Sequence, residues 1–267
     1  MMNNKRIDSV LKSENIGVLP SDIKAFNVSD LKIDQPISYL YNSSLRLGKA
    51  IEKVFSACVN ASSNYKIIQE NTQIQDGKIT LGELDFVLEQ TDTKQLIHLE
   101  LVYKFYVYDS DNSKNELGKW IGPNRKDSFT EKLTKLTTKQ FPFLYHPITK
   151  KKCIDFNVNS LEQRLCFMVN LFVPFAKQNI TYPKINNKAI VGFWLNLSDF
   201  NTELDPEYNY YLPQKSEWGI DPKNNTIWNS KTEILLQIKA QHQRQFSPLC
   251  WIKKPNLTFK QCFVVWW

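Results

Sequence analysis

The sequence predicts a mixed α/β (α+β) fold, and three features of the chain support this prediction. Residues 81–108 alternate between apolar and polar side chains, as two strands joined by a short polar turn would. Residues 42–60 carry apolar side chains at helical spacing, which is typical of an amphipathic helix. Three strand-like runs follow later in the chain, at 163–175, 188–200 and 259–267. We therefore expect a sheet packed with helices and a β-rich, tryptophan-rich C-terminal half.

The composition indicates a globular protein of one large domain or two small ones. The chain has 267 residues, of which 42% are hydrophobic and 23% are charged. We expect a core over residues 1–155 and a β-rich region over 156–267. The net charge of +7 favours a polyanionic partner, so nucleic acid is the expected partner.

No apolar run approaches the length of a membrane span, and the start of the chain lacks the apolar segment of a secretory signal. We expect no membrane association and a cytoplasmic location.

Several kinds of chemistry find no support in the sequence. The five cysteines form no C-x-x-C pair, and the three histidines form no metal-spaced pair. We expect buried free thiols instead of disulfides or a zinc site. The chain also has no glycine-rich phosphate loop, so no nucleotide cofactor is expected. The sequence leaves the oligomeric state open.

The first strong element is the helix expected over residues 42–60, with Asn42 or Ser43 as its cap. Gly48 lies inside this helix, where glycine costs about 1 kcal/mol relative to alanine, so we expect something to approach it closely. Glu52 lies at the edge of the apolar stripe and can point toward the polar face of the sheet. A solvated helix glutamate is the alternative.

The predicted hairpin brings acidic residues together. A short strand over residues 65–69 and a turn at residues 76–77 precede it. If its loop consists of residues 92–93, Asp85 on the first strand lies opposite Glu100 on the second, with Cβ atoms about 5 Å apart. Two carboxylates this close repel each other unless a proton or a cation lies between them. Glu83 and His98 lie on the same polar face.

This pair of carboxylates has the chemistry of a magnesium site. Mg²⁺ takes hard oxygen ligands and needs only one or two protein carboxylates beside water and phosphate. Lys104 follows Glu100 by four residues on the same face, where it can stabilise an anionic transition state. The alternative is an ordinary solvated face of a half-exposed sheet.

A lysine-rich helix is expected after the hairpin. Asp127 or Ser128 caps it, and Gln140 ends it before Pro142. Three lysines cover much of its surface: Lys132, Lys135 and Lys139. These lysines either contact phosphates or form an ordinary solvated face. A basic loop at residues 150–152 follows.

The second half of the chain contains six of the seven tryptophans. Prolines punctuate its loops, and residues 233–243 are expected to form a helix. Most of these tryptophans are expected to pack in a core or an interface, and a minority to stack on bases.

Three stretches resemble a known family. They are LGELDFVL, HLELVYKFYVY and WIGPNRKDSFTEKLTKL, and they are similar to the bacterial domain-of-unknown-function 1853 family. The pattern consists of a G-E-L-D strand, an E-x-x-x-K-F strand, a W-x-G-P-N turn and a D-x-x-x-x-K-L helix. The similarity continues through VGFWL, SEWGIDP and the terminal FVVWW, so it covers most of the chain.

The resemblance implies a fold and a site. The family is grouped by fold with the PD-(D/E)XK nuclease superfamily, which implies a mixed central β-sheet flanked by helices and a restriction-endonuclease-like core. The implied site residues are Glu52, Asp85, Glu100 and Lys104, with Asp85 and Glu100 as metal ligands. The chain departs from the superfamily in one respect: the acid and the lysine are usually two residues apart, and Val102 fills the expected lysine position.

The leading functional hypothesis is a Mg²⁺-dependent (or Mn²⁺-dependent) nuclease that hydrolyses nucleic-acid phosphodiesters. The lysines of the 129–140 helix would contact the backbone, and Glu83 and His98 would lie beside the metal ligands. One alternative is a catalytically inactive nuclease fold that binds nucleic acid or protein. Another is a structural protein whose tryptophan-rich half packs against a partner.

Overall fold

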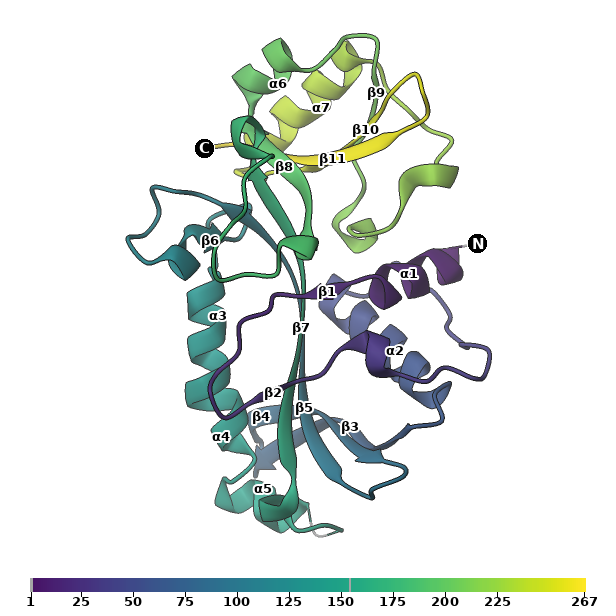
Figure 1. The fold of residues 1–267 in the computed structure, drawn as a ribbon, viewed down its shortest axis with the longest axis vertical. Coiled ribbons are helices and arrows are strands. Elements are labelled where there is room, and N and C mark those ends of the chain that lie inside the picture. Colours follow the sequence, from purple (N-terminus) through teal and green to yellow (C-terminus); the bar gives the residue numbers. More distant parts are fainter. Residues whose placement is uncertain (1, 154) are drawn as a thin grey trace. The chain divides into compact units, whose positions relative to one another are not determined.

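The computed structural model describes residues 2–153 and 155–267. In this part of the chain, eleven strands join one sheet with the main order β3-β4-β5-β7-β8-β11-β10-β9 (Figure 1). The pairs β7–β8 and β8–β11 are parallel, whereas β3–β4, β4–β5 and β10–β11 are antiparallel. The predicted mixed α/β class, with a mixed sheet and helices, is therefore confirmed.

The elements have the following bounds in chain order. The strands are β1 (Glu14–Asn15), β2 (Lys24–Ala25), β3 (Tyr65–Asp76), β4 (Ile79–Gln90), β5 (Leu96–Tyr108), β6 (Trp120–Ile121), β7 (Glu162–Pro174), β8 (Ile190–Asn196), β9 (Asn209–Tyr211), β10 (Leu249–Lys253) and β11 (Phe259–Val265). The α-helices are α1 (Met2–Leu11), α2 (Leu47–Asn60), α3 (Phe129–Lys135), α4 (Phe141–Phe143), α5 (Pro147–Lys152), α6 (Leu197–Glu203) and α7 (Lys231–His242).

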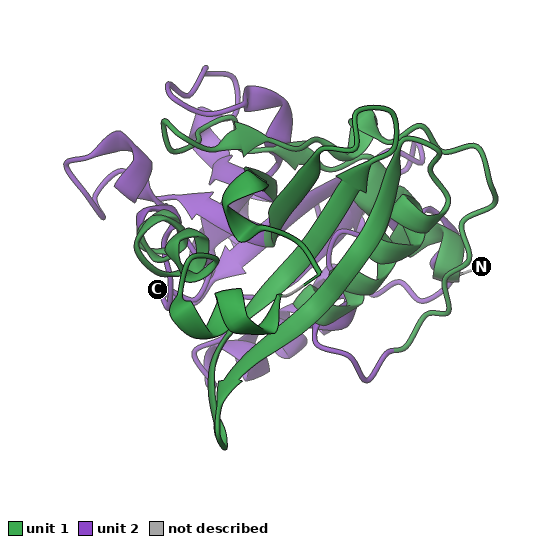
Figure 2. Ribbon diagram, turned by 90° about the horizontal axis from the view of Figure 1, so that it is seen from below, with its two compact units in different colours: residues 1–42, 48–103, 131–168 green, residues 43–47, 104–130, 169–267 purple. Residues whose placement is uncertain are grey.

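The chain divides into two compact units, shown in different colours in Figure 2. Unit 1 comprises residues 1–42, 48–103 and 131–168, and unit 2 comprises residues 43–47, 104–130 and 169–267. The lysine-rich helix therefore belongs mostly to unit 1, whereas the last residues of β5 belong to unit 2. The sequence-based boundary between residues 155 and 156 stays a prediction.

Helix α2 covers the central hairpin of unit 1. Its apolar stripe is buried as predicted, and the ring of Phe55 lies 5.0 Å from that of Phe86 on β4. The helix begins at Leu47, later than the expected cap at Asn42 or Ser43. The expectation for Gly48 is wrong, because a Cβ atom built there would have no neighbour within 4 Å.

The strand predicted over residues 65–69, before the hairpin, is longer in the structure. β3 continues past Gln69 to Asp76, although this stretch has little apolar alternation. Pairing with β4 along its whole length satisfies its backbone groups, so hydrogen bonding maintains the strand where side-chain burial does not. The predicted turn is confirmed, with Gly77 at a φ of +56°.

The register of β4 and β5 is confirmed. Phe86 pairs with Leu99 and Val87 with His98, which is the register that places Asp85 opposite Glu100. The two-residue loop is wrong. The backbone amides of Gln90 and Lys94 both donate within the turn, so the connection spans residues 91–94.

The lysine-rich helix continues beyond its predicted end. Between α3 and α4, residues Leu136–Gln140 form a π-helical segment, and α4 then includes Pro142. The proline falls in the first turn of α4, where its missing N–H is tolerated. The wider π-helical turn immediately before α4 accommodates the backbone hydrogen bond that Pro142 cannot donate.

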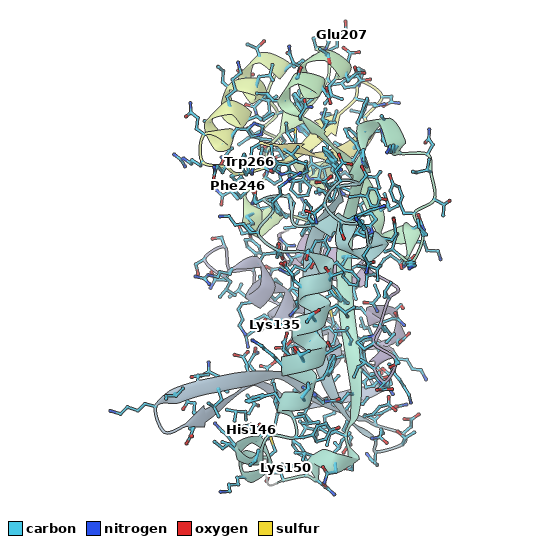
Figure 3. The ribbon with its side chains drawn as sticks, turned by 90° about the vertical axis from the view of Figure 1, so that its left-hand side faces the viewer. Lys135, His146, Lys150, Glu207, Phe246 and Trp266 are labelled. Atoms are coloured by element: carbon cyan, nitrogen blue, oxygen red, sulfur yellow. The ribbon has the colours of Figure 1, made fainter. Side chains whose placement is uncertain are left out.

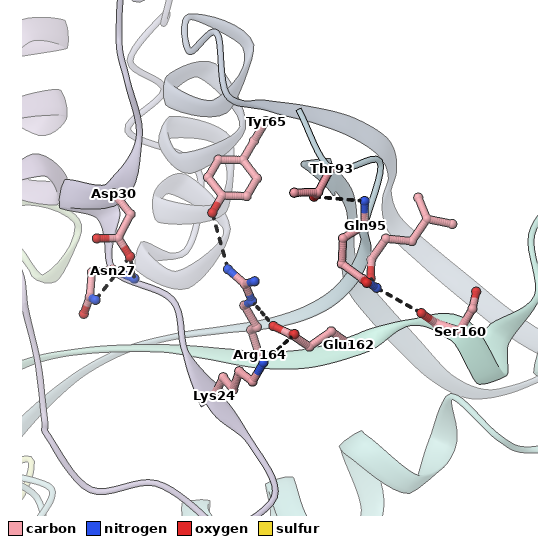
Figure 4. A network of polar contacts seen from close by, with 10 residues as sticks. Lys24, Asn27, Asp30, Tyr65, Thr93, Gln95, Ser160, Glu162 and Arg164 are labelled. Carbon is pink, nitrogen blue, oxygen red and sulfur yellow. Dashed lines mark hydrogen bonds and ion pairs between the residues drawn. The ribbon is translucent and has the colours of Figure 1, made fainter. Parts of the chain in front are cut away.

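A polar network ties β2 and β3 to the start of β7 in unit 1 (Figure 4). Glu162 accepts hydrogen bonds from Lys24 at 2.7 Å and from Arg164 at 2.5 Å. Arg164 also donates to the hydroxyl of Tyr65 at 3.3 Å. The β4–β5 connection is attached to the same region, because the side-chain amide of Gln95, directly after the loop, donates to the backbone carbonyl of Ser160.

Unit 2 has an aromatic and aliphatic core of its own. Trp218 is 3% exposed, and its ring contacts Phe105, Phe246 and Phe263. Helix α7 is capped by Ser230 and matches the helix predicted over 233–243. Trp218 therefore packs in a core as predicted, whereas the other tryptophans of this half are half-buried: Trp194, Trp228, Trp251, Trp266 and Trp267.

The cysteines and the helices bear on two further predictions, of free thiols and of no membrane span. All five cysteines are buried and none is in a disulfide, as predicted. Among residues 2–153 and 155–267, the helices are too short or too polar to traverse a bilayer.

Candidate functional site

The strand pair β4–β5 places Asp85 and Glu100 next to each other. The backbone ladder ends at Phe86 and Leu99, one position before the two acids. There, Asp85 Oδ2 accepts a hydrogen bond from the Leu101 amide at 2.9 Å, so a side chain continues the contact between the strands. His98 and Glu100 are fully buried. The alternative of a solvated face is therefore wrong at these two positions.

Glu100 is linked to the lysine-rich helix through Gln140. The Gln140 amide donates to Glu100 Oε2 at 2.5 Å, and Lys132 Nζ donates to Gln140 Oε1 at 2.8 Å. Gln140 ends the π-helical segment, whose extra residue per turn sets the direction of its side chain. Lys132 thus faces the carboxylate pair instead of standing free on a solvated helix surface.

His98 lies on the other side of Glu100. Its Nε2 atom is 3.2 Å from Glu100 Oε1, without the alignment of a hydrogen bond. The Gln163 amide nitrogen donates to the Phe141 carbonyl at 2.8 Å and lies 3.2 Å from His98 Nδ1. Because that nitrogen can only donate, Nδ1 accepts and the neutral ring carries its proton on Nε2. Burial lowers the pKa of His98 to about 4, although the charge of Asp85 acts in the opposite direction, so the ring is neutral at pH 7.

A lysine on α2 holds the two other predicted acids. Lys49 Nζ lies 2.7 Å from Glu52 and 2.6 Å from Glu83, and it also donates to the side chain of Asn71 at 2.9 Å. Burial raises the pKa of Glu52, and the charge of Asp85 raises it further, while Lys49 lowers it. The structure therefore brings Glu52 and Glu83 into the electrostatic environment of Asp85.

The central acids have strongly raised pKa values. Burial, followed by the charge of Glu100, raises the pKa of Asp85 to about 7, although the Leu101 amide and Lys132 oppose this shift. Burial raises the pKa of Glu100 to about 8 despite the nearby charge of Lys132. Near pH 7 the pair therefore retains protons, which a cation could displace.

Lys104 has a different environment from the one expected. Its Nζ atom lies 2.5 Å from Asp127 Oδ2, and both residues belong to unit 2. Asp127, a predicted helix cap, therefore serves as the ion-pair partner of Lys104. Lys135 and Lys139 are exposed on the helix, and Figure 3 labels Lys135 there.

Lys49 and Gln163 are the residues that sequence reasoning missed. Lys49 precedes Glu52 by one helical turn, so the spacing of the pair on α2 was a usable signal. Gln163 lies on β7, 65 residues after His98, and nothing in the local sequence connects the two.

The donor set fits a hard divalent cation such as Mg²⁺ or Mn²⁺. Glu100 Oε1 is buried and accepts no hydrogen bond from the described residues, and Asp85 adds a second carboxylate. In residues 2–153 and 155–267, no cluster of three or more His, Cys, Asp or Glu side chains has metal-binding geometry. A two-carboxylate site completed by water and substrate oxygens still suits Mg²⁺, which seldom uses an all-protein cage.

These features define a mixed α/β protein in which a half-buried acid, Asp85, and a fully buried acid, Glu100, lie on two neighbouring strands of its sheet. The family model for the domain of unknown function DUF1853 matches residues 18–264, and the chain belongs to this family. The resemblance seen in the sequence is confirmed at the level of the family. No curated protein matches the chain. The search of solved structures likewise gives no match.

Proposed function

We propose that the protein is a metal-dependent nuclease of the PD-(D/E)XK type that hydrolyses nucleic-acid phosphodiesters. The observation that carries this proposal is the opposed pair on adjacent strands, the half-buried Asp85 and the fully buried Glu100, beside Lys132. Two carboxylates in this setting need a proton or a cation between them. The net charge of +7 suits a polyanionic substrate.

In this proposal Asp85 and Glu100 hold Mg²⁺ or Mn²⁺. A bound cation of this kind polarises a phosphate and lowers the pKa of a coordinated water. Gln140 holds the carboxylate of Glu100 in place, and Lys132 holds Gln140. Glu52, kept in place by Lys49, accepts a proton or orients a water near Asp85.

Lys132 takes the electrostatic role first expected for Lys104. It lowers the pKa of both central acids and therefore stabilises their charged forms. A cationic group at this place also stabilises the developing charge on a phosphate. Lys104 forms an ion pair with Asp127, and this proposal assigns it no role.

The test measures Mg²⁺ and Mn²⁺ binding by calorimetry on the wild type and on the double variant Asp85→Asn, Glu100→Gln. We expect binding in the wild type and its loss in the variant, together with loss of cleavage of labelled DNA and RNA. Because Mg²⁺ sites can require substrate phosphate, binding is also measured with a non-cleavable oligonucleotide present. Equal metal binding by both proteins under both conditions would overturn the proposal.

A second candidate is a nuclease fold that binds nucleic acid without hydrolysing it. The pairing of Lys104 with Asp127 favours it, because the expected acid–lysine arrangement on β5 is not formed. In this case, nucleic-acid binding would be independent of metal and unchanged in Asp85→Asn, and cleavage would be undetectable in every variant.

A further inference from the structure

The segment from residue 131 to residue 155 is strongly basic. It contains six lysines and two acids: Lys132, Lys135, Lys139, Lys150, Lys151, Lys152, Glu131 and Asp155. The segment forms most of α3, the π-helical turn, α4 and α5, and it belongs entirely to unit 1. Figure 3 shows Lys135, His146 and Lys150 following one another along it.

Four of these lysines differ from a group of lysines in unit 1 that glutamates neutralise. Lys24, Lys49, Lys53 and Lys94 each form an ion pair with a glutamate. Lys135, Lys139, Lys150 and Lys151 are exposed, and in the part of the chain that the structure describes no carboxylate lies within ion-pair distance of them. Their charges are therefore available to an external anion.

The basic segment lies against the β3–β4 hairpin a few residues before its turn. Lys152 Nζ donates to the backbone carbonyl of Gln73 on β3 at 2.5 Å. The Phe143 ring fills the space beside Gly82 on β4, where an added Cβ atom would lie only 2.7 Å from it. The α5 lysines and the hairpin are thus held together as one surface.

The tip of the β3–β4 hairpin is exposed to solvent. Residues 75–81 are all exposed, including Ile79 at 68%. The end of the hairpin extends away from the helices of unit 1 (Figure 3). Lys78 lies in its turn, next to Gly77. The tip is therefore a two-stranded β-ribbon exposed on both faces, and such a ribbon can enter a groove of nucleic acid.

We propose that α3, α5 and the β3–β4 hairpin form a surface for double-stranded DNA, with the lysines on phosphates and the hairpin tip in the major groove. This inference rests on the proposed function, and it identifies the form of the substrate. The major groove of B-form DNA is about 12 Å wide and admits a two-stranded ribbon. The major groove of double-stranded RNA is deep and narrow and excludes one.

The first test measures binding of a labelled 20-base-pair DNA duplex in EDTA, so that hydrolysis does not contribute. The variant Lys150→Ala, Lys151→Ala, Lys152→Ala is compared with a control of equal charge change, Lys177→Ala, Lys188→Ala, Lys239→Ala, whose lysines are exposed in unit 2. We expect a loss of at least ~10-fold for the α5 variant and less than ~3-fold for the control.

The salt dependence of binding provides a second measure of the same surface. Each phosphate contact contributes about 0.9 to the slope of log affinity against log salt concentration, so the slope of the α5 variant should fall by roughly 2 to 3. A variant that melts like the wild type but binds with unchanged affinity and slope would overturn the proposal. Equal losses in the α5 variant and the control would also overturn it, because only net charge would then matter.

A hairpin variant tests the form of the nucleic acid. Lys78→Ala combined with Ile79→Ala should lower affinity for duplex DNA about 5-fold and leave affinity for duplex RNA unchanged. Equal losses for both would overturn the assignment to the major groove. Tighter binding to anionic phosphatidylserine vesicles than to DNA, lost in the α5 variant, would assign the surface to a membrane instead.

A catalytic variant separates this inference from the proposed function. Asp85→Asn should abolish cleavage and keep duplex binding in EDTA. If neither the wild type nor any variant cleaves nucleic acid but the α5 variant loses duplex binding, the proposed DNA-binding surface is supported and the nuclease proposal fails. If the wild type cleaves single strands only and ignores duplex DNA, the nuclease proposal stands and this inference fails.

Discussion

At the scale of single residues, the site is governed by the low polarity around two acids. Burial raises the pKa of both Asp85 and Glu100, and their mutual repulsion adds to the shift of Asp85. Lys132 and the Leu101 amide oppose these shifts but do not cancel them. Ionisation of these two acids in the folded protein therefore costs stability, and pKa values perturbed in this way cluster at functional sites.

These shifts predict a loss of stability in alkaline solution. The pKa values of about 7 and 8 lie above the ordinary values of 3.8 and 4.5, so between these limits the folded state holds more protons than the unfolded state. Stability from this pair is fully present below about pH 4, falls as pH rises toward the folded-state pKa values of about 7 and 8, and is gone above them. Without added metal, we expect urea unfolding free energies to fall by roughly 2 kcal/mol between pH 6.5 and pH 8.5.

The variant Asp85→Asn should remove part of this dependence, because an amide does not titrate and can still accept from the Leu101 amide, whereas Glu100 continues to titrate. Asp92→Asn, in the exposed hairpin loop, is the control and should leave the pH dependence unchanged. A wild type whose stability is flat over this range would contradict the assignment of buried protonated acids.

The two candidate lysines can be distinguished by the same measurement. Lys132 lowers the pKa of both acids, so Lys132→Met should destabilise the protein about 1 kcal/mol more at pH 8.5 than at pH 6.5. Lys104→Met should show no such difference, because its partner is Asp127 in unit 2. Equal pH profiles for the two variants would mean that Lys132 has no special coupling to the acids.

At the scale of elements, close packing decides which glycines matter. An added Cβ atom at Gly192 on β8 would lie 2.2 Å from the Gln261 carbonyl of β11 and 2.8 Å from the Phe172 ring of β7. All three strands belong to unit 2 at these positions. Gly48 in α2, by contrast, has open space around it.

We expect opposite effects from substituting these two glycines by alanine. Gly192→Ala should destabilise the protein by about 2 kcal/mol or more, because backbone atoms of neighbouring strands must move apart. Gly48→Ala should stabilise it by up to about 1 kcal/mol through helix propensity. Thermal unfolding of the two variants measures both effects, and a stabilised Gly192→Ala protein would contradict the strand packing described here.

At the scale of the whole molecule, each compact unit is assembled from segments far apart in the chain. Unit 1 takes residues 131–168 after a gap of 27 residues that belong to unit 2. Val158 and Leu161 complete a buried cluster with Leu84 and Val87 of β4. Contacts distant in sequence therefore hold the candidate site together.

A fragment that ends at residue 155 should fail to fold cooperatively. It would lack Val158 and Leu161 from the buried cluster, and the Glu162 and Arg164 network with Lys24 and Tyr65. We expect circular dichroism of residues 1–155 to show a broad transition, against a sharp one for the full chain. A sharp transition would support the sequence-based boundary at residue 155 as a true domain limit.

The local features of the protein could be predicted from its amino-acid sequence. Alternation identified the two strands β4 and β5, and the turn assumed at residues 92–93 gave the register that pairs Asp85 with Glu100. The observed connection over residues 91–94 is centred on the same two residues, so the register is the same although the loop is longer. Helical spacing identified the buried stripe of α2. The family pattern was also readable, since its motifs lie within short stretches of chain.

Only the tertiary structure decided which polar groups meet across long sequence distances. Gln163 approaches His98, Lys49 joins Glu83 to Glu52, and Lys104 pairs with Asp127. Apart from the helical spacing of Lys49 and Glu52, these contacts follow no helical or strand period, so no local pattern predicts them. Burial is likewise a property of the assembled protein. It makes Glu100 a fully enclosed acid with a raised pKa, where the same alternation in an open sheet would place a charged side chain in water.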